Sequence, residues 1–150
     1  MAAPTVVREW RVPFAGRAPS DLPAEWAAAV AAVTRDLGCR RNGRAVSLES
    51  VEWTLAVFSD GSVAIGFATT ADDADLSAFS MGRGFAFEAT SAQAMVWVAS
   101  VVQDELAGYE FVQWPSDGSR LYAPDLMDGT AVWVDHVGRV IAPIGALCRR

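Results

Sequence analysis

The longest regular alternation of hydrophobic and polar positions lies in residues 51–70, on both sides of Ser59-Asp60-Gly61-Ser62. This alternation predicts a β-hairpin, because successive side chains of a strand point to opposite faces of a sheet. Two registers fit the turn. A two-residue Asp-Gly loop sets the large side chains of the two strands on opposite faces, whereas a three-residue loop with a left-handed Gly61 sets them on one face.

A half-buried sheet needs its large side chains on one face, so we expect the three-residue loop. The resulting pairs are Trp53 with Phe67, Leu55 with Ile65, and Val57 with Val63. The opposite face then carries small or polar residues, namely Glu52, Thr54, Ala56, Ala64, Gly66 and Ala68. Three uses of this second face stay open: contact with solvent, close packing of an alanine-rich helix, or docking of a partner backbone.

Two segments have the period of amphipathic helices. In residues 21–37, Ser20 or Asp21 can cap the first turn, and the apolar stripe consists of Trp26, Val30, Val33 and Leu37. In residues 91–107, Thr90 and Gln93 match a capping box ahead of a longer apolar stripe. The sequence therefore predicts two helices.

The other elements are shorter. Residues 5–12 predict a strand at a sheet edge, residues 84–89 a short strand, and residues 131–134 and 139–142 a second hairpin that ends at Pro143. Strands that come in hairpins favour an α+β fold, with an antiparallel sheet built around residues 51–70 and two helices packed against it. The chain has 150 residues, which predicts one globular domain over residues 1–150.

Composition and charge exclude several classes of function. The net charge of −6, with acidic residues along the whole length, argues against a nucleic-acid-binding protein. The apolar runs are too short for a membrane span, and the first ten residues lack the apolar core of a signal peptide. We therefore expect a cytoplasmic protein in which Cys39 and Cys148 are reduced, buried thiols, while a bridge between them stays open.

Reactive side chains are few. The chain has one histidine, His136, two cysteines and no lysine. It lacks the phosphate-binding, dinucleotide-binding and nucleophile-elbow motifs, and it has no closely spaced ligand pair for zinc. We predict no metal and no cofactor, and we expect a non-enzymatic role while leaving catalysis open. His136 follows Asp135 in a predicted turn, where a solvated side chain is the expected state and a general base the alternative.

The C-terminal third contains the stretches Trp114-Pro115, Ala131-Val132-Trp133-Val134 and Ile141-Ala142-Pro143-Ile144-Gly145-Ala146-Leu147. This pattern resembles a group of small uncharacterised bacterial proteins. In that group, Cys-Pro-x-His-type residues often follow Trp-Pro, and another cysteine follows the Trp-Val strand, as in a zinc knuckle. Here Ser116 and Asp117 follow Trp-Pro, and Asp135-His136 follow the strand. The resemblance therefore implies no metal site in this chain and transfers no activity.

Three functional hypotheses follow from these observations. The first is a small acidic module that binds another protein, for example an immunity or antitoxin-like neutraliser of a basic partner. Its candidate contact residues are Asp72, Asp73, Asp75, Trp114, Asp135 and His136. The second is a carboxylate-based enzyme or small-ligand binder, whose candidate acids are Glu49, Glu52, Glu88 and Asp135. The third is a homo-oligomeric assembly subunit that uses the small-residue face of the sheet.

Overall fold

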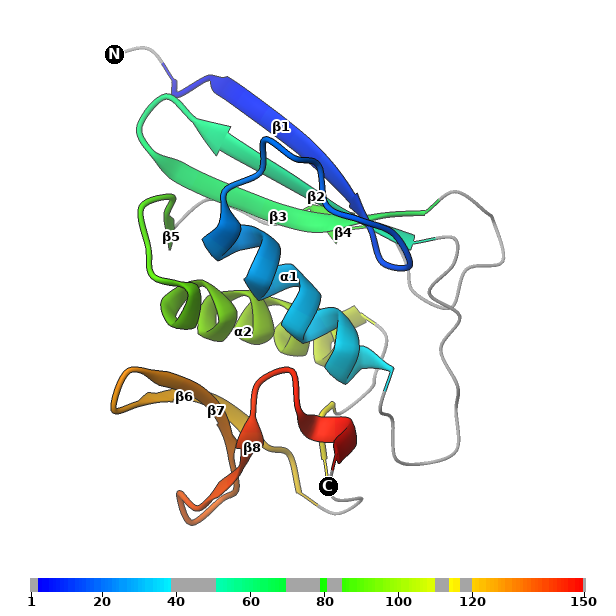
Figure 1. Ribbon diagram of the computed structural model, residues 1–150, viewed down its shortest axis with the longest axis vertical. Helices are drawn as coiled ribbons and strands as arrows, with labels where there is room; N and C mark the ends of the chain where they lie inside the picture. Colours follow the sequence, from blue (N-terminus) through cyan, green and yellow to red (C-terminus); the bar gives the residue numbers. More distant parts are fainter. Residues whose placement is uncertain are drawn as a thin grey trace. The chain divides into compact units, whose positions relative to one another are not determined.

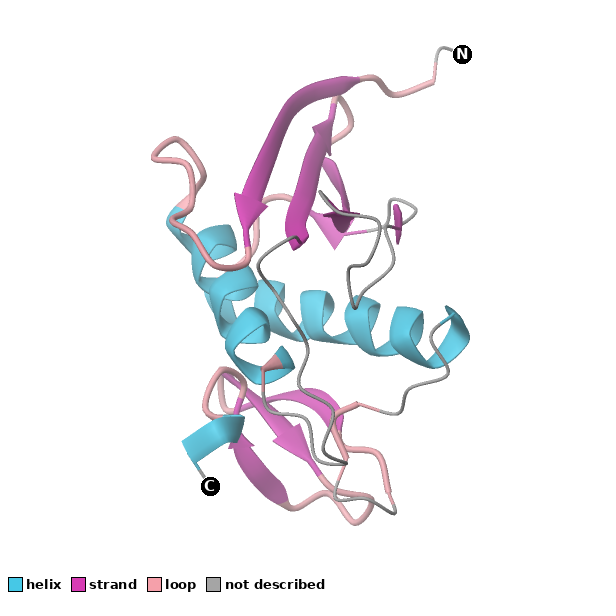
Figure 2. Ribbon diagram, turned by 90° about the vertical axis from the view of Figure 1, so that its right-hand side faces the viewer, coloured by secondary structure: helices cyan, strands magenta, loops and turns pink. Residues whose placement is uncertain are grey.

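The computed structural model describes residues 3–38, 51–69, 79–80, 85–109, 114–116 and 120–149. The fold is α+β, as predicted, with helices and two antiparallel sheets (Figures 1 and 2). The contacts divide the chain into two compact units. Unit 1 comprises Met1–Pro23 and Ser47–Ala89, and unit 2 comprises Ala24–Val46 and Thr90–Arg150. The single domain over residues 1–150 stays a prediction.

Unit 1 is built on an antiparallel sheet. Its long strands are β1 (Val6–Pro13), β2 (Val51–Phe58) and β3 (Ser62–Thr69), which lie in this order (Figure 1). Two short strands, β4 (Phe79–Ser80) and β5 (Phe85–Ala86), both pair with β3. The first strand lies at the end of the strand order, which confirms the predicted edge position.

The hairpin of β2 and β3 has the expected register. Trp53 pairs with Phe67, Leu55 with Ile65, and Val57 with Val63. Gly61 has a φ of 81°, and its N–H donates to the carbonyl oxygen of Phe58 at 2.9 Å. The left-handed glycine in a three-residue loop therefore sets all the large side chains of the hairpin on one face.

That face forms the core of unit 1. The ring of Phe14, just after β1, lies 4.9 Å from the ring of Trp53 and 5.2 Å from that of Phe67. Trp53 itself is fully buried. Aromatic pairs at these separations add stabilisation to the burial of their surface. The other buried side chains of the three long strands are Trp10, Val12, Val51, Leu55, Val57, Val63 and Ile65.

Unit 2 contains the two main helices, α1 (Ala24–Leu37) and α2 (Ser91–Tyr109). They pack against each other, and the rings of Trp26 and Trp97 meet edge to face at 5.8 Å. The capping box of α2 is confirmed, because the Gln93 N–H donates to Thr90 Oγ1 at 3.1 Å and the Thr90 N–H donates to Gln93 Oε1 at 3.0 Å. Among the described residues, no helix has both the length and the apolar character needed to cross a membrane.

The second sheet consists of β6 (Ala123–Met127), β7 (Thr130–Val134) and β8 (Val140–Pro143), followed by the 3₁₀ helix η1 (Leu147–Arg149). Helix α2 contacts β6 and β7. The pairing of β7 with β8 confirms the second predicted hairpin. Strand β6 was not predicted, because Pro124 and Asp125 both disfavour a strand. Proline is tolerated there because β6 is an end strand of its sheet.

The turn at Gly61 yields a stability prediction. A Cβ added at Gly61 would meet no atom within 4 Å, so substitution there tests the left-handed backbone rather than a steric clash. We expect Gly61→Ala to lower the free energy of unfolding by about 1–2 kcal/mol, and Gly61→Asn to lower it by less because asparagine tolerates this conformation. Urea denaturation of the two variants measures the difference. Equal losses would contradict the left-handed turn as the cause.

Candidate functional site

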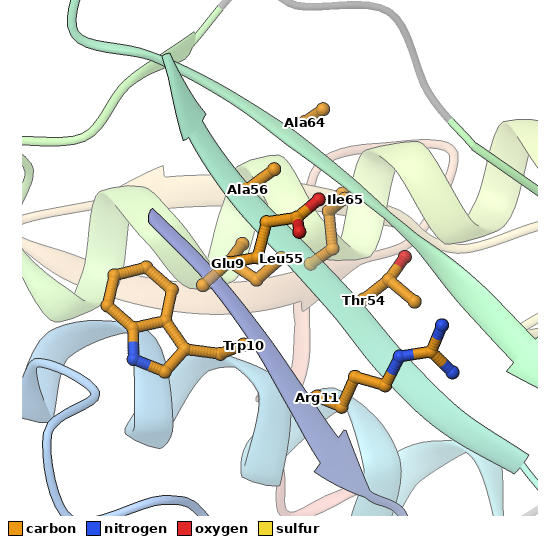
Figure 3. A pocket seen from close by; sticks show the side chains of 8 residues that line it. All are labelled: Glu9, Trp10, Arg11, Thr54, Leu55, Ala56, Ala64 and Ile65. Carbon is orange, nitrogen blue, oxygen red and sulfur yellow. The ribbon is translucent and has the colours of Figure 1, made fainter. Parts of the chain in front are cut away.

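A hollow lies on the face of the unit 1 sheet that is opposite the aromatic core (Figure 3). Its volume is about 250 Å³. The floor is low because the register places Ala56 opposite Ala64 and Thr54 opposite Gly66 on this face. The full set of lining residues is Glu9, Trp10, Arg11, Thr54, Leu55, Ala56, Ala64 and Ile65. The small-residue face predicted from the sequence is therefore present, and it is hollowed.

Two charged side chains of β1, Glu9 and Arg11, line this hollow. Arg11 Nη1 lies 2.7 Å from Glu52 Oε1, and the side chains of Arg11 and Glu52 are 66% and 19% exposed. Glu9 extends from β1 over the hollow, while the guanidinium of Arg11 points away from it (Figure 3). Among the described residues Glu9 has no ion pair, although it is exposed. The hollow thus offers an open carboxylate beside a guanidinium that is already paired.

The other face of β1 carries a buried tryptophan with an unusual environment. The Trp10 ring stacks on Phe87 at 5.9 Å, and the Arg8 guanidinium lies 4.8 Å from the Trp10 ring centroid. Arg8 also pairs with Asp21. The Trp10 Nε1–H is buried and has no acceptor among the described residues. An unsatisfied buried donor costs about 1–3 kcal/mol, which the aromatic and cation–π contacts of this residue help to offset.

Unit 2 contains a fully buried acidic side chain at the end of α1. Asp36 is 0% exposed. Its Oδ2 accepts hydrogen bonds from Trp133 Nε1 and the Gly145 N–H, both at 2.7 Å, and its Oδ1 accepts one from the Leu147 N–H at 3.0 Å. Both carboxyl oxygens therefore act as hydrogen-bond acceptors. One side chain ties α1 to β7 and to the segment that leads into η1.

Sequence reasoning missed Asp36, although a signal was present. The residue lies on the buried stripe of α1, three positions after Val33 and next to Leu37. A negative charge near the C-terminal end of a helix is unfavourable for the helix dipole. An acid that is both on the apolar stripe and at this end therefore needs donors from elsewhere in the fold. The hydrogen bonds to the two carboxyl oxygens supply these donors. Because Asp36 is fully buried, it has no exposed surface for chemistry.

Trp114 belongs to the same network, and its burial corrects the prediction that it is a contact residue. It is 2% exposed, its Nε1 donates to the Asp36 backbone oxygen at 3.2 Å, and its ring meets Trp133 edge to face at 5.3 Å. The buried Gln103 side chain donates to the backbone oxygens of Trp114 and Tyr122. Trp114 therefore packs inside unit 2 and cannot anchor a partner in this conformation.

The Asp135–His136 pair lies in an exposed turn. Asp135 Oδ1 accepts hydrogen bonds from the N–H groups of Val137 at 3.0 Å and Arg139 at 2.9 Å. The backbone donor of Arg139 is the main cause that lowers the pKa of Asp135, and Val137 and the positive charges of His136 and Arg139 act in the same direction. His136 itself is exposed, as expected for a solvated turn residue. Asp135 serves to organise the turn.

The remaining predicted contact residues, and the candidate acids of the second hypothesis, are only partly covered by the structure. Asp72, Asp73, Asp75 and Glu49 lie outside the described residues, so their roles stay predictions. Glu52 is paired with Arg11, which lines the hollow, but it is not itself a lining residue. Glu88 is exposed and follows β5 in unit 1. Among the described residues, no three histidine, cysteine, aspartate or glutamate side chains gather as a potential metal site.

The cysteine prediction is wrong for Cys148. This residue is exposed and disulfide-bonded rather than a reduced, buried thiol. Its Sγ lies 3.5 Å from the backbone oxygen of Arg35. The only other cysteine in the sequence is Cys39, which lies outside the described residues. Disulfides are typical of oxidising compartments. The cytoplasmic location, which was inferred in part from reduced thiols, therefore loses that support and stays a prediction.

Comparison with known proteins adds no relative. No family model matches the chain, and neither the curated proteins nor the solved structures contain a match. The interpretation of the hollow therefore depends on its geometry and chemistry alone.

The buried carboxylate of Asp36 yields a stability prediction. Asp36→Asn keeps the shape of the side chain but turns an NH₂ group toward N–H donors, in either orientation of the amide. We expect a loss of about 2–4 kcal/mol in the free energy of unfolding, because buried donors lose their acceptor. Asp104→Asn removes the same charge from an exposed position on α2 and should change stability by about 0.5 kcal/mol or less. Denaturant titration compares the two, and similar losses would contradict the anchoring role.

The Asp135 turn yields a prediction about pH. Because the folded pKa of Asp135 is below the ordinary value of 3.8, the deprotonated form favours the turn. Its contribution is present at neutral pH and is lost as the pH falls through the folded pKa. We expect the amides of Val137 and Arg139 to lose protection against hydrogen exchange in this acidic range. Asp135→Asn should remove that pH dependence, and unchanged wild-type protection down to pH about 2 would contradict the assignment.

Proposed function

We propose that this chain is a protein-binding module and that the hollowed face of the unit 1 sheet is its docking surface. The observation that carries the proposal is the combination of a floor of small side chains with an exposed Glu9, which has no ion pair within the described part of the chain. A low floor lets a partner side chain or backbone approach the sheet closely. The free carboxylate then supplies an acceptor for a basic or hydrogen-bonding group of that partner.

The size of the hollow favours a protein partner over a small ligand. Pockets for small molecules usually have volumes of about 300–1,000 Å³ and enclose most of the ligand. The hollow is smaller, at about 250 Å³, and it is lined by an edge strand whose charged residues are exposed. The alternative of a carboxylate-based enzyme also finds little support here, because Glu52 is held by Arg11 at 2.7 Å.

Charge indicates the kind of partner. The net charge of −6 favours a basic protein, because complementary charge accelerates association and disfavours acidic competitors. An immunity or antitoxin-like neutraliser would bind its target in this way, and we propose this role for the chain. The acidic run at Asp72, Asp73 and Asp75 would extend the negative surface.

A pull-down with matched variants tests this proposal. Ala56→Arg places a long side chain on the floor of the hollow, while Asp104→Arg adds a long basic side chain on α2, outside the hollow. We expect wild-type protein and Asp104→Arg to retain one stoichiometric partner from native cells, and Ala56→Arg to lose at least about tenfold in affinity, as a difference of about 1.4 kcal/mol produces.

Salt provides the second measurement. Raising ionic strength should weaken the wild-type complex, because the charged contacts are exposed and screened. A partner that Ala56→Arg still binds at full strength, in a salt-independent manner, would contradict docking on this face. Circular dichroism of Ala56→Arg must match that of the wild type, so that loss of binding is separated from loss of folding.

A further inference from the structure

The outer edge of β1 exposes a short backbone segment. β1 is the end strand of its sheet, and the N–H of Phe14 donates to the carbonyl oxygen of Val51 at 3.1 Å. Hydrogen-bonded pairs alternate along an antiparallel ladder, so Val12 and Trp10 also direct their backbone groups to β2. Glu9 and Arg11, which lie between them in this alternation, direct their N–H and C=O groups outward.

Two features limit this open edge. The register of β1 against β2 shifts between Val6 and Arg8, which interrupts the regular ladder on one side. On the other side Pro13 has no N–H to donate. The regular outward donors are therefore those of Glu9 and Arg11, and both residues have exposed side chains. An incoming strand can form only a short ladder with β1. The charges at these two positions therefore strongly affect which strand pairs with this edge and in which register.

We propose that the edge of β1 pairs in antiparallel fashion with β1 of a second copy of this chain, with Glu9 of each copy opposite Arg11 of the other. The two-fold axis then passes beside Trp10. In this register Glu9 of one copy and Arg11 of the other form a hydrogen-bonded pair, and symmetry repeats this pair once. Each pair contains two N–H···O bonds, because the backbone N–H and C=O groups of both residues point outward. Both charge pairs are favourable in this register.

The same charges oppose the neighbouring registers. A shift in one direction sets Glu9 opposite Glu9, and a shift in the other sets Arg11 opposite Arg11, and like charges directly opposite are destabilising. Glu9 has no ion pair within the described residues and is free for the new contact. Arg11 keeps its ion pair with Glu52. Its side chain is nevertheless 66% exposed, and its guanidinium has further N–H donors for the new contact.

This inference goes beyond the proposed function and does not depend on it. Both proposals use Glu9, but the dimer forms from purified protein alone through the strand edge, whereas the proposed docking needs another protein on the floor of the hollow. Ala64→Trp fills this floor without adding a charge opposite Glu9, whose cross-strand neighbour is Ala56, so it should lose the partner and keep the dimer. The two proposals can fail separately.

Charge reversal in solution tests the pairing. Analytical ultracentrifugation of the wild type should show a concentration-dependent monomer–dimer equilibrium. Glu9→Arg and Arg11→Glu should each weaken it by about tenfold or more, because each reversal turns both symmetric pairs from attractive to repulsive. Mixing the two variants in equal amounts should restore dimer, since every opposing pair in the mixed species has opposite charges. Asp104→Arg carries the same charge change as Glu9→Arg and should associate like the wild type.

Hydrogen exchange locates the contact. As protein concentration rises, the amides of Glu9 and Arg11 should gain protection, while those of Trp10 and Val12 should stay constant because they already bond within the sheet. The proposal is overturned if the wild type is monomeric up to about 1 mM. At that concentration only a dimer with a free energy of association weaker than about 4 kcal/mol would escape detection. A dimer that both variants leave intact, or that mixing fails to restore, overturns it equally, because another surface then forms it.

Discussion

The cross-strand register of β2 and β3 is the constraint on which unit 1 depends. It brings Trp53, Leu55 and Val57 onto the face that also holds Phe67, Ile65 and Val63. A slip of one residue would turn one strand over and send its large side chains to the opposite face. The same register puts Ala56 opposite Ala64, so the aromatic core on one face and the low floor on the other have a single origin.

Unit 2 depends on a polar interaction instead. Its C-terminal segment approaches α1 so closely that a Cβ on Gly145 would lie 3.0 Å from Ala32 Cβ. Asp36 holds this segment through the N–H groups of Gly145 and Leu147. A buried carboxyl group is costly to desolvate, yet it accepts bonds from several directions, which an apolar side chain cannot do. This specificity of direction explains why an acid occupies a position that periodicity assigns to a hydrophobic residue.

Sequence reasoning succeeded where burial alone distinguishes the alternatives. The hairpin register followed from the need to gather large side chains on one face, and the capping box at Thr90 and Gln93 followed from local hydrogen bonding. It missed β6, whose strand state depends on pairing with β7 rather than on its own residues. It also misjudged Trp114, because composition cannot distinguish an exposed aromatic anchor from one whose N–H is satisfied by a distant backbone oxygen. The hollow was predictable only as a face of small residues.

The charges on β1 have two physical interpretations, and their order along the strand distinguishes between them. Charged residues, a bulge and a proline at a sheet edge all discourage uncontrolled strand pairing. Protection of that kind needs only repulsion, which charges of one sign at Glu9 and Arg11 would supply in every antiparallel register. Opposite signs at the two outward positions repel when each residue meets its own copy, and attract when each meets the other. The edge therefore selects one register of a second identical strand while it resists the others, as a specific contact requires.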